Sequence, residues 1–391
     1  MSDLYEMPLR RESEALAEAG FDVEVICMRN TAERPNDTTL NGVRITGLPA
    51  SLSRSGRMKY AFEYVWFFAL AATVVGARHL RRRYAVVQVN TMPDFLVFAP
   101  VVPKLFGARI LAYMKEPIPE LADTLFDNRR LTRMLARIEQ GALRFADHAL
   151  TVTKELKERY VERGADPERI TVVLNGASPE AMQHEWSPPE TSKEGFTVLS
   201  HGTIEDRYGQ DTLVEAAALL REEMPDLRVV LSGRGSGVDD LEAQIAKLGV
   251  EDVVDFRGWV TWSEIADLLY LADVGVVAQK ASPYSHLVQT NKMVDYWIFG
   301  TPVIASRLRS VSELYDDSVL EYFEPGDAES LAEAIRRLRN DPERREELAR
   351  NGRRALEQNG WHVQREIYLG VYRKLLDGRA DAAQTAEPSS P

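Results

Sequence analysis

Residues 290–305 read TNKMVDYWIFGTPVIA, a short run that contains signals for a helix start, a helix end and a strand start. Thr290 or Asn291 can cap a helix whose first turn holds Lys292. Gly300 is typical of the end of a helix, and the apolar residues after Pro302 are typical of a buried strand. The run therefore predicts a helix followed by a strand, as in a layered α/β domain.

The same alternation of strand and helix continues on both sides of this run. Short runs rich in Val, Leu and Ile alternate with amphipathic segments of about 10 to 15 residues, which is typical of βαβ units on a parallel sheet. The strands expected in the first half are 23–27, 43–46, 85–89, 109–113, 148–152 and 170–173, with helices at 10–19 and 94–106. The strands expected in the second half are 197–200, 228–231, 253–256, 274–278 and 302–305, with helices at 212–223, 239–248, 262–270, 292–299 and 328–339.

The domain boundaries follow from length and composition. A chain of 391 residues exceeds the about 250 to 300 at which one hydrophobic core stops growing. The stretch 177–195 is rich in proline and polar residues and predicts a linker. We therefore expect Rossmann-like domains at 1–176 and 196–358, a helix at 359–376 and a small, polar, disordered tail at 377–391.

The beginning of the chain departs from this pattern. A Rossmann-like domain normally opens with an apolar strand that leads into its first loop. Here Met1 and the next residues form the loop, and the pattern passes straight into a helix. We therefore expect that the first strand of the N-terminal domain is missing, as after a start codon placed too far downstream.

Composition excludes several classes of function. A net charge of −12 argues against a nucleic-acid-binding protein, which would show a basic domain or stripe. The one cysteine, Cys27, excludes an internal disulfide framework and a cysteine-rich zinc site, and it suits a reducing cytoplasm. The six histidines lack metal-binding spacing, and the P-loop and the G-x-S-x-G motif are absent. We expect neither a metal site nor a bound cofactor.

An uncharged apolar stretch at 64–77 is too short to cross a bilayer, which takes about 20 residues. Basic residues flank it: Arg54, Arg57 and Lys59 before it, and Arg78, Arg81, Arg82 and Arg83 after it. One interpretation is a buried helix with a solvated basic end. The other is a helix that rests on an anionic membrane surface.

Two glycine-rich turns follow predicted strands of the second half. Gly202 and Thr203 come at a strand end, where a glycine lets a ligand approach the backbone, and Arg207 adds a planar cation suited to a diphosphate. His201, beside Gly202, is the one histidine that we place near a ligand. The run 232–237, SGRGSG, contains Gly233 but has G-x-G-x-G spacing, so it favours a turn lining a nucleotide pocket over a nicotinamide-cofactor motif.

Lys292 and Asp295 lie on the first turn of the helix in the opening run. A helix N-terminus with a lysine suits phosphate groups, and a carboxylate nearby suits the paired hydroxyls of a ribose. The alternative is an exposed ion pair on a helix surface.

Taken together, these runs resemble one family, the retaining glycosyltransferases of the GT-B superfamily, family-4 type (glycosyl transferases group 1). The resemblance covers nearly the whole chain. It rests on 292–305, 207–216 (RYGQDTLVEA), 255–260 (DFRGWV), 90–95 (NTMPDF), 146–153 (ADHALTVT), 170–176 (ITVVLNG) and a final helix at 361–375.

The resemblance implies an α/β fold of two facing Rossmann-like domains, with a C-terminal helix that crosses back to the N-terminal domain. The N-terminal domain would bind an acceptor, and the C-terminal domain would bind a nucleotide-diphosphate sugar without metal. Arg207 and Lys292 would act on the diphosphate and Asp295 on the ribose. The remaining donor-binding positions would be Gly202, Thr203, Gly233, Gly258, Trp259, Thr290 and Asn291, with Gly258 and Trp259 at the base. Lys115, Glu116 and Glu120 would lie on the acceptor or sugar side.

The sequence departs from the family pattern at several positions. Of two glutamates usual in the family, the first falls on Leu287 and the second on Asp295, and Thr203 and Lys115 replace a common arginine and histidine. We expect a retaining, metal-independent transfer of a sugar to a glycan, lipid-linked or small-molecule acceptor, in the cytoplasm or at the inner face of the membrane. The departures favour an alternative, a non-catalytic nucleotide-sugar-binding subunit of a glycan-assembly system. A nicotinamide-dependent oxidoreductase would need the dinucleotide fingerprint that this chain lacks.

Overall fold

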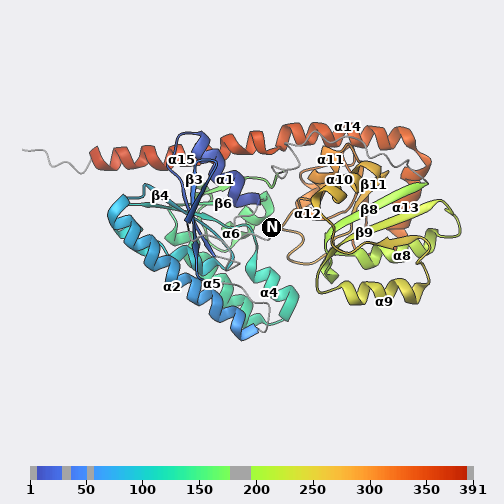
Figure 1. The fold of residues 1–391 in the computed structure, drawn as a ribbon, viewed down its shortest axis with the longest axis horizontal. Helices are drawn as coiled ribbons and strands as arrows, with labels where there is room; N and C mark the ends of the chain where they lie inside the picture. Colours follow the sequence, from blue (N-terminus) through green and yellow to red (C-terminus); the bar gives the residue numbers. More distant parts are fainter. Residues whose placement is uncertain (1–6, 29–36, 51–56, 177–194, 385–391) are drawn as a thin grey trace, which may run out of the picture. The chain divides into compact units, whose positions relative to one another are not determined.

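The computed structural model describes residues 7–28, 37–50, 57–176 and 195–384. The chain divides into two compact units, drawn in Figure 1. Unit 1 comprises Met1–Leu174 and His362–Pro391, and unit 2 comprises Asn175–Trp361. The change of unit after Leu174 lies two residues from the predicted domain end at 176. Most of the predicted linker, 177–194, lies outside the described residues.

Unit 2 is built on one continuous parallel sheet. Its strand order is β10-β9-β8-β11-β12-β13, and every neighbouring pair is parallel. The strands are β8 (Phe196–Thr203), β9 (Leu227–Arg234), β10 (Val254–Phe256), β11 (Val274–Val277), β12 (Val303–Ser306) and β13 (Glu321–Phe323). Their apolar residues are buried because helices cover both faces of the sheet, as the runs without alternation predict.

The helices of unit 2 form two layers. One hydrophobic cluster joins the sheet to α8 (Gln210–Leu220), α9 (Val238–Leu248) and α13 (Ala328–Asn340). A second cluster joins it to α10 (Trp262–Leu271), α11 (Lys292–Ile298) and α12 (Arg309–Ser312). Figure 1 shows α8 and α9 on one side of the strands and α10 and α11 on the other. The helix α14 (Pro342–Asn359) contributes Leu348 to the first cluster and Ala355 to the second.

The order of the strands places a topological switch point beside β8. From β8 the chain moves outward through β9 and β10, and it then returns to pair β11 with the other side of β8. In open α/β sheets, ligands bind beside the carboxyl ends of the two strands at such a reversal. The residues after β8 and β11 are therefore where a ligand of unit 2 is expected.

Unit 1 contains two separate sheets. The first has the order β1-β3-β2, formed by β1 (Glu24–Met28), β3 (Val43–Leu48) and β2 (Asp37–Leu40). The second has the order β4-β5-β6-β7, formed by β4 (Val86–Asn90), β5 (Arg109–Tyr113), β6 (His148–Thr151) and β7 (Ile170–Val172). Within the described ranges, β1 and β4 are thus both edge strands.

One predicted helix of unit 1 is divided in the structure. The helix expected at 94–106 is divided into a 3₁₀ helix, η1 (Asp94–Phe98), and α3 (Val101–Leu105). Pro100 lies at the break, where it lacks the N–H that a continuous helix would require. The other helical segments are α1 (Met7–Glu18), α2 (Arg57–Arg82), α4 (Ile118–Phe126), α5 (Arg129–Phe145), α6 (Lys154–Glu162), η2 (Pro167–Arg169) and α15 (Trp361–Gln384).

The long helix α2 contains the apolar stretch at 64–77 and is buried on one side only. Ala71, Gly76 and His79 are buried, whereas Phe62 and Leu80 are exposed. The buried-helix interpretation therefore describes one face of α2. Among the described residues, no helix has both the length and the hydropathy to cross a membrane.

The last helix, α15, packs on unit 1. The hydroxyls of Tyr368 and Tyr372 donate to Oε1 of Gln88 on β4 at 2.9 and 2.8 Å, and the backbone N–H of Leu174 donates to Oε1 of Gln364 at 2.9 Å. The tail predicted to be disordered from 377 is helical as far as Gln384. Alanine and glutamine in this stretch are good helix formers, which accounts for the continuation.

Candidate functional site

The first component of the site is the contact between the end of β8 and the start of α11. Gly202 has a φ of +106°, and a Cβ atom there would lie 2.7 Å from Cε of Lys292. A Cβ atom there would push the lysine side chain aside, and the positive φ itself favours glycine. Gly202 and Lys292, predicted independently as site residues, therefore meet at the switch point.

Lys292 presents an ammonium group without an ion-pair partner among the described residues. Its Nζ lies 4.5 Å from the ring centroid of Tyr208, a cation–π contact. Burial lowers the pKa of Lys292 to about 8, and the nearby carboxylate of Asp295 opposes that shift. A bound anion would restore full protonation, so the environment of this lysine favours an anionic ligand.

Asp295 and His201 lie beside Lys292. Burial raises the pKa of Asp295 to about 7, and the lysine opposes the shift. Nε2 of His201 is 4.0 Å from Oδ2 of Asp295 and makes no hydrogen bond to the part of the chain that is described. Burial lowers the pKa of His201 to about 3, so the imidazole is neutral near pH 7. Asp295, Lys292 and His201 therefore offer a carboxyl group, an amine and a neutral imidazole to one ligand.

Arg207 is held more firmly than Lys292. It lies in η3 (Asp206–Tyr208), with Nη2 at 2.9 Å from Oε2 of Glu205. Its guanidinium carbon lies 5.1 Å from the ring centroid of Tyr208 and 5.4 Å from that of Tyr284. The carboxylate of Glu205 partly offsets the charge of Arg207, so Lys292 is the less compensated cation of the two.

Glycines bring the end of β9 against the end of β8. A Cβ atom on Gly233 would overlap the carbonyl oxygen of Gly202, and one on Gly235 would overlap that of Ile204. The N–H of Gly233 donates to the carbonyl of Gly258 at 2.8 Å. The turn that contains Gly258 is therefore fixed at the same edge of the sheet as Gly202.

Trp259 follows this turn and exposes its indole. It is 61% exposed, and the guanidinium of Arg234 lies 5.6 Å from the ring centroid. An exposed aromatic face next to an arginine can stack on a planar ring such as a nucleobase.

The residues before α11 depart from the predicted capping. Asn291 occupies the N-cap position but has helical backbone angles and makes no capping hydrogen bond with its side chain. Because φ and ψ are helical, its oxygen does not reach the free N–H groups of the next turn. Oγ1 of Thr290 is buried with no hydrogen bond to any described residue. Thr203 is exposed at the end of β8.

The three residues predicted on the acceptor side belong to unit 1. Nζ of Lys115 lies 2.7 Å from Oε1 of the buried Glu12. Oε1 of Glu120 lies 2.7 Å from Nη2 of Arg163, which also pairs with Glu139 at 3.0 Å. Lys115 and Glu120 thus take part in two separate internal networks. Glu116 is half-buried.

Sequence reasoning did not identify two aromatic residues of the site. Tyr208 and Tyr284 flank Arg207, and Tyr284 is buried. Tyr208 lies inside the motif 207–216, so its position could have suggested a role. No sequence pattern marks Tyr284, because only the fold brings it close to Arg207.

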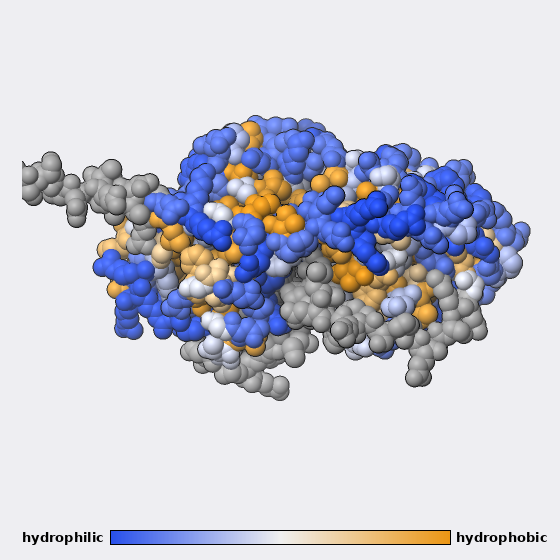
Figure 2. Space-filling view, turned by 90° about the horizontal axis from the view of Figure 1, so that it is seen from above, coloured by the Kyte–Doolittle hydropathy of each residue, from blue (hydrophilic) through white to orange (hydrophobic). Residues whose placement is uncertain are grey.

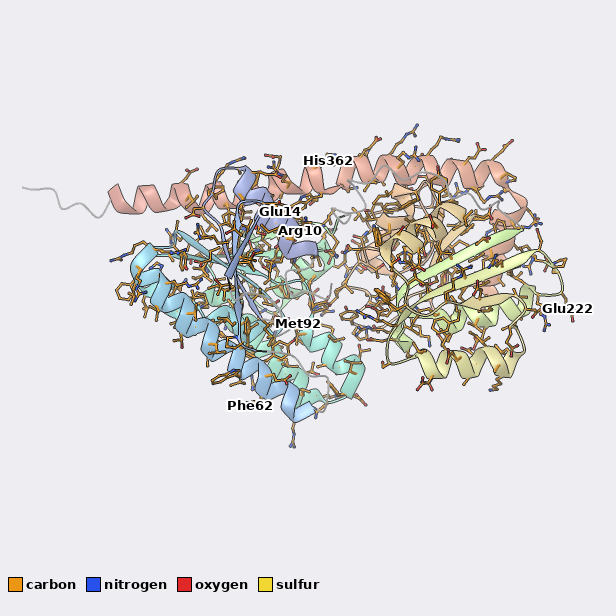
Figure 3. All side chains as sticks on the ribbon, in the orientation of Figure 1. Arg10, Glu14, Phe62, Met92, Glu222 and His362 are labelled. Atoms are coloured by element: carbon orange, nitrogen blue, oxygen red, sulfur yellow. The ribbon has the colours of Figure 1, made fainter. Side chains whose placement is uncertain are left out.

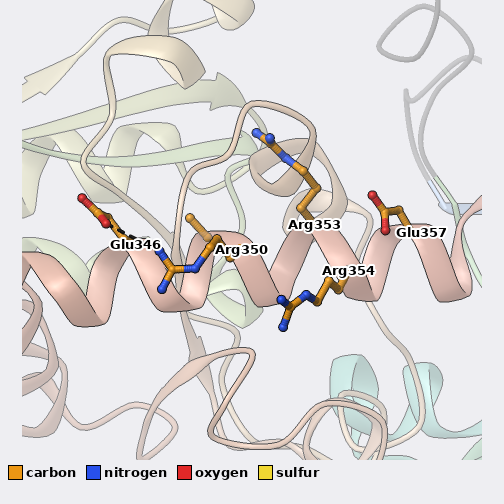
Figure 4. A pocket seen from close by; sticks show the side chains of 6 residues that line it. Glu346, Arg350, Arg353, Arg354 and Glu357 are labelled. Atoms are coloured by element: carbon orange, nitrogen blue, oxygen red, sulfur yellow. Dashed lines mark ion pairs between the residues drawn. The ribbon is translucent and has the colours of Figure 1, made fainter.

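A shallow depression of about 470 Å³ lies elsewhere in unit 2, on the outer face of α14. Glu346, Arg350, Arg353, Arg354 and Glu357 line it, and Glu346 pairs with Arg350 at 3.5 Å (Figure 4). Figure 2 shows a strongly hydrophilic surface over this helix. The depression contains none of the predicted site residues. No cluster of His, Cys, Asp and Glu within the described ranges could hold a metal ion.

Two family models match the chain in succession. Residues 8–176 match the glycosyl transferase 4-like domain, and residues 182–355 match the glycosyl transferases group 1. The chain is 25% identical to D-inositol 3-phosphate glycosyltransferase of Paenarthrobacter aurescens (strain TC1) over 93% of its own length and 91% of the relative's.

Solved structures show the same fold. Sucrose-phosphate synthase from Thermosynechococcus elongatus matches with a TM-score of 0.74 at 21% identity, over 95% of this chain and 93% of that one. Anabaena Alr3699/HepE in complex with UDP-glucose matches with a TM-score of 0.65 at 15% identity, over 90% of this chain and 99% of that one. With both family models matched in order, the chain belongs to the group 1 glycosyltransferases and is an enzyme of the GT-B fold.

Proposed function

We propose that unit 2 binds the diphosphate of a nucleotide-sugar donor at Lys292 and Arg207. The observation that carries this proposal is the ammonium of Lys292, which lies beside Gly202 at the switch point without a carboxylate in ion-pair range among the described residues. A half-buried cation without an ion pair, at a helix start, is a favourable position for a phosphate.

The rest of the donor fits the neighbouring groups. Asp295 follows Lys292 on α11 and would accept hydrogen bonds from the ribose hydroxyls. Trp259 would stack on the base beside the turn at Gly258. Gly233, Thr203, Thr290 and Asn291 would complete the donor site. Anabaena Alr3699/HepE has been solved with UDP and with UDP-glucose, which supports a uridine nucleotide as the first to test.

The proposed reaction is transfer with retention of configuration and without a metal. The bond between the anomeric carbon and the β-phosphate oxygen breaks, an acceptor oxygen bonds to the same face of the sugar, and the proton of the acceptor hydroxyl passes to the departing diphosphate. Negative charge grows on the departing diphosphate, so cations placed there stabilise the transition state more than the ground state. Lys292 and Arg207 would supply that stabilisation.

We propose that the acceptor binds at unit 1, on the side of Lys115, Glu116 and Glu120. Several relatives are named D-inositol 3-phosphate glycosyltransferase, and one is named lipopolysaccharide core biosynthesis glycosyltransferase LpsE, from Rhizobium meliloti (strain 1021). These names support a polyhydroxylated acceptor, which can be a glycan, a lipid-linked sugar or a small molecule. The buried Cys27, the one cysteine of the chain, fits a reducing cytoplasm as the place of work.

A thermal-shift screen followed by a transfer assay tests the donor. Uridine or guanosine diphosphate should raise the melting temperature, whereas NAD should leave it unchanged. At 100 times the dissociation constant, binding adds about 2.7 kcal/mol to the free energy of unfolding. Stabilisation by NAD alone would contradict the proposal. Donor binding without turnover on any acceptor of a polyol and glycan panel would remove the proposed roles of Lys292 and Arg207 in transfer.

A further inference from the structure

We propose that the exposed face of α2 docks on an anionic membrane surface. The sequence leaves open whether this helix is buried or rests on lipid, and the structure shows which side chains are free to meet a surface. The inference concerns unit 1 alone and is independent of the donor site in unit 2.

The exposed face of α2 forms an uncharged stripe. Phe62, Val65, Trp66 and Leu80 are 68%, 56%, 48% and 54% exposed. Figure 3 shows Phe62 on the outer side of the helix. The exposed residues Ala69, Thr73 and Ala77 continue the stripe between Trp66 and Leu80 at helical spacing. From Phe62 to Leu80 the stripe extends about 27 Å at 1.5 Å per residue.

The neighbouring helix α3 adds further exposed apolar residues to the stripe. The short α3 packs against α2, where a Cβ atom on Gly76 would touch Val102 at 3.4 Å. Leu105 and Phe106, at the end of α3, are 78% and 52% exposed. Exposed apolar side chains gathered on two adjacent helices are typical of an interaction surface.

The stripe ends in cations that the protein does not neutralise. Arg81 and Arg83 are exposed and form no ion pair within the described ranges, whereas Arg82 lies 3.5 Å from Glu24. Apolar residues with adjacent basic ones are the composition of helices that lie in a membrane interface.

The two units differ in net charge, so the −12 of the whole chain does not describe the unit that carries the stripe. Residues 1–174 contain 25 Lys and Arg against 22 Asp and Glu, a net charge of +3. Residues 175–361 contain 19 against 34, a net charge of −15. The acidic character belongs to unit 2, and the unit that carries the stripe is weakly basic.

An anionic surface fits this face better than a second copy of the chain. Glu63, which is half-buried, is the one carboxylate on the part of α2 whose side chains are described. Two stripes packed on each other could bring at most this one half-buried carboxylate of α2 to Arg81 and Arg83. Phosphate groups of lipids would neutralise both arginines while the acyl chains cover Trp66 and Phe62.

Sedimentation with vesicles tests the proposal on the full chain. The protein should bind vesicles of phosphatidylglycerol and phosphatidylcholine and should not bind phosphatidylcholine alone. Arg81→Gln with Arg83→Gln should weaken binding roughly 30-fold, at about 1 kcal/mol for each basic residue near the surface. Phe62→Ser with Trp66→Ser should weaken it to a similar degree. Two changes of exposed residues in unit 2, Arg354→Gln and Leu219→Ser, should leave vesicle binding unchanged.

Fluorescence gives a second readout that a loss of fold would not imitate. Brominated acyl chains should quench Trp66 in the bound protein, and Trp66→Phe should remove that quenching while it preserves sedimentation. Equal binding to neutral vesicles, or no binding, would overturn the proposal. A concentration-dependent dimer that Phe62→Ser with Trp66→Ser dissociates would overturn it in favour of a second copy.

Discussion

The candidate donor site of unit 2 and the predicted acceptor side of unit 1 differ in how their buried polar groups are paired. In unit 2, three groups lie near the same helix start: Lys292 has no ion pair, and Nε2 of His201 and Oγ1 of Thr290 have no hydrogen bond, among the described residues. In unit 1, Glu12, Lys115, Glu120 and Arg163 pair with one another or with close neighbours. Buried polar groups are costly when unpaired, so those left unpaired at a switch point indicate a ligand, and those already paired indicate structure.

The sheets show the same contrast. The six strands of unit 2 form one sheet whose order defines the site, whereas the described strands of unit 1 form two separate sheets. The site of unit 2 can therefore be located from topology. The acceptor side of unit 1 cannot, because the described strands do not form a single sheet with a switch point.

The largest effect is expected from the buried ion pairs of unit 1. Arg163→Leu leaves Glu120 and Glu139, both buried, without their shared partner. Removing one side of a buried pair lowers the free energy of unfolding by about 3 to 5 kcal/mol. Denaturant unfolding measures the loss.

The control for Arg163 is an ion pair on the surface of unit 2. Arg336 pairs with Glu223 at 2.8 Å, and their side chains are 37% and 49% exposed. Arg336→Leu should cost less than about 1 kcal/mol. Equal losses for Arg163→Leu and Arg336→Leu would show that the buried network of unit 1 contributes no more to stability than a surface ion pair.

A smaller effect, about 100-fold in turnover, is expected from Lys292→Ala in unit 2. The ammonium stabilises charge that grows on the leaving diphosphate, so kcat should fall more than donor affinity. Asp295→Asn should do the reverse, since a contact with the ribose is the same before and during the reaction. Steady-state kinetics and donor titration separate the two. If kcat and donor affinity were those of the wild type in both variants, α11 would not be part of the active site.

The smallest effect is expected from the titration of buried carboxyl groups in unit 1. The free energy of unfolding should change by about 1.4 kcal/mol per pH unit for each extra proton that the folded state binds. Burial raises the pKa of Asp94 to about 8 and that of Glu139 to about 7. Both lie above the values of an unfolded chain, about 3.9 and 4.3. The folded state therefore binds more protons, and stability should fall as the pH rises from about 4 to 8.

Asp94→Asn isolates this contribution, because the amide resembles the protonated carboxyl group in shape and charge. Unfolding measured from pH 5 to pH 8 should show a shallower decline for Asp94→Asn than for the wild type. Parallel curves would mean that Asp94 is ionised in the folded protein and that another group sets the slope.

Much of the fold could be predicted from sequence because its strands are continuous apolar runs. The strand predicted at 109–113 coincides with β5, and the one at 274–278 extends one residue beyond β11. The short, polar β2 was missed, since Asp37–Leu40 pairs with β3 through backbone contacts that leave no hydrophobic pattern. The charged α14 was missed because its few buried residues, such as Leu348, Gly352 and Ala355, give a weak apolar face.

The site was only partly predictable for a different reason. Glycines at strand ends and a lysine at a helix start are local signals, so Gly202 and Lys292 could be named from sequence. Their contact could not, because it depends on the order of strands that brings β8 beside β11. The roles assigned to Lys115, Glu116 and Glu120 came from the resemblance and stay predictions.

The position of α15 near the end of the chain affects the order in which the two units can fold during synthesis. Unit 2 is continuous in sequence, but unit 1 needs His362 and the residues after it, which place Tyr368 and Tyr372 on Gln88. During synthesis at about 5 to 20 residues per second, the whole of unit 2 is translated before α15 can reach its place on β4. Unit 1 is therefore begun first and completed last. Its surface beside Gln88 stays uncovered on the ribosome while unit 2 can already fold.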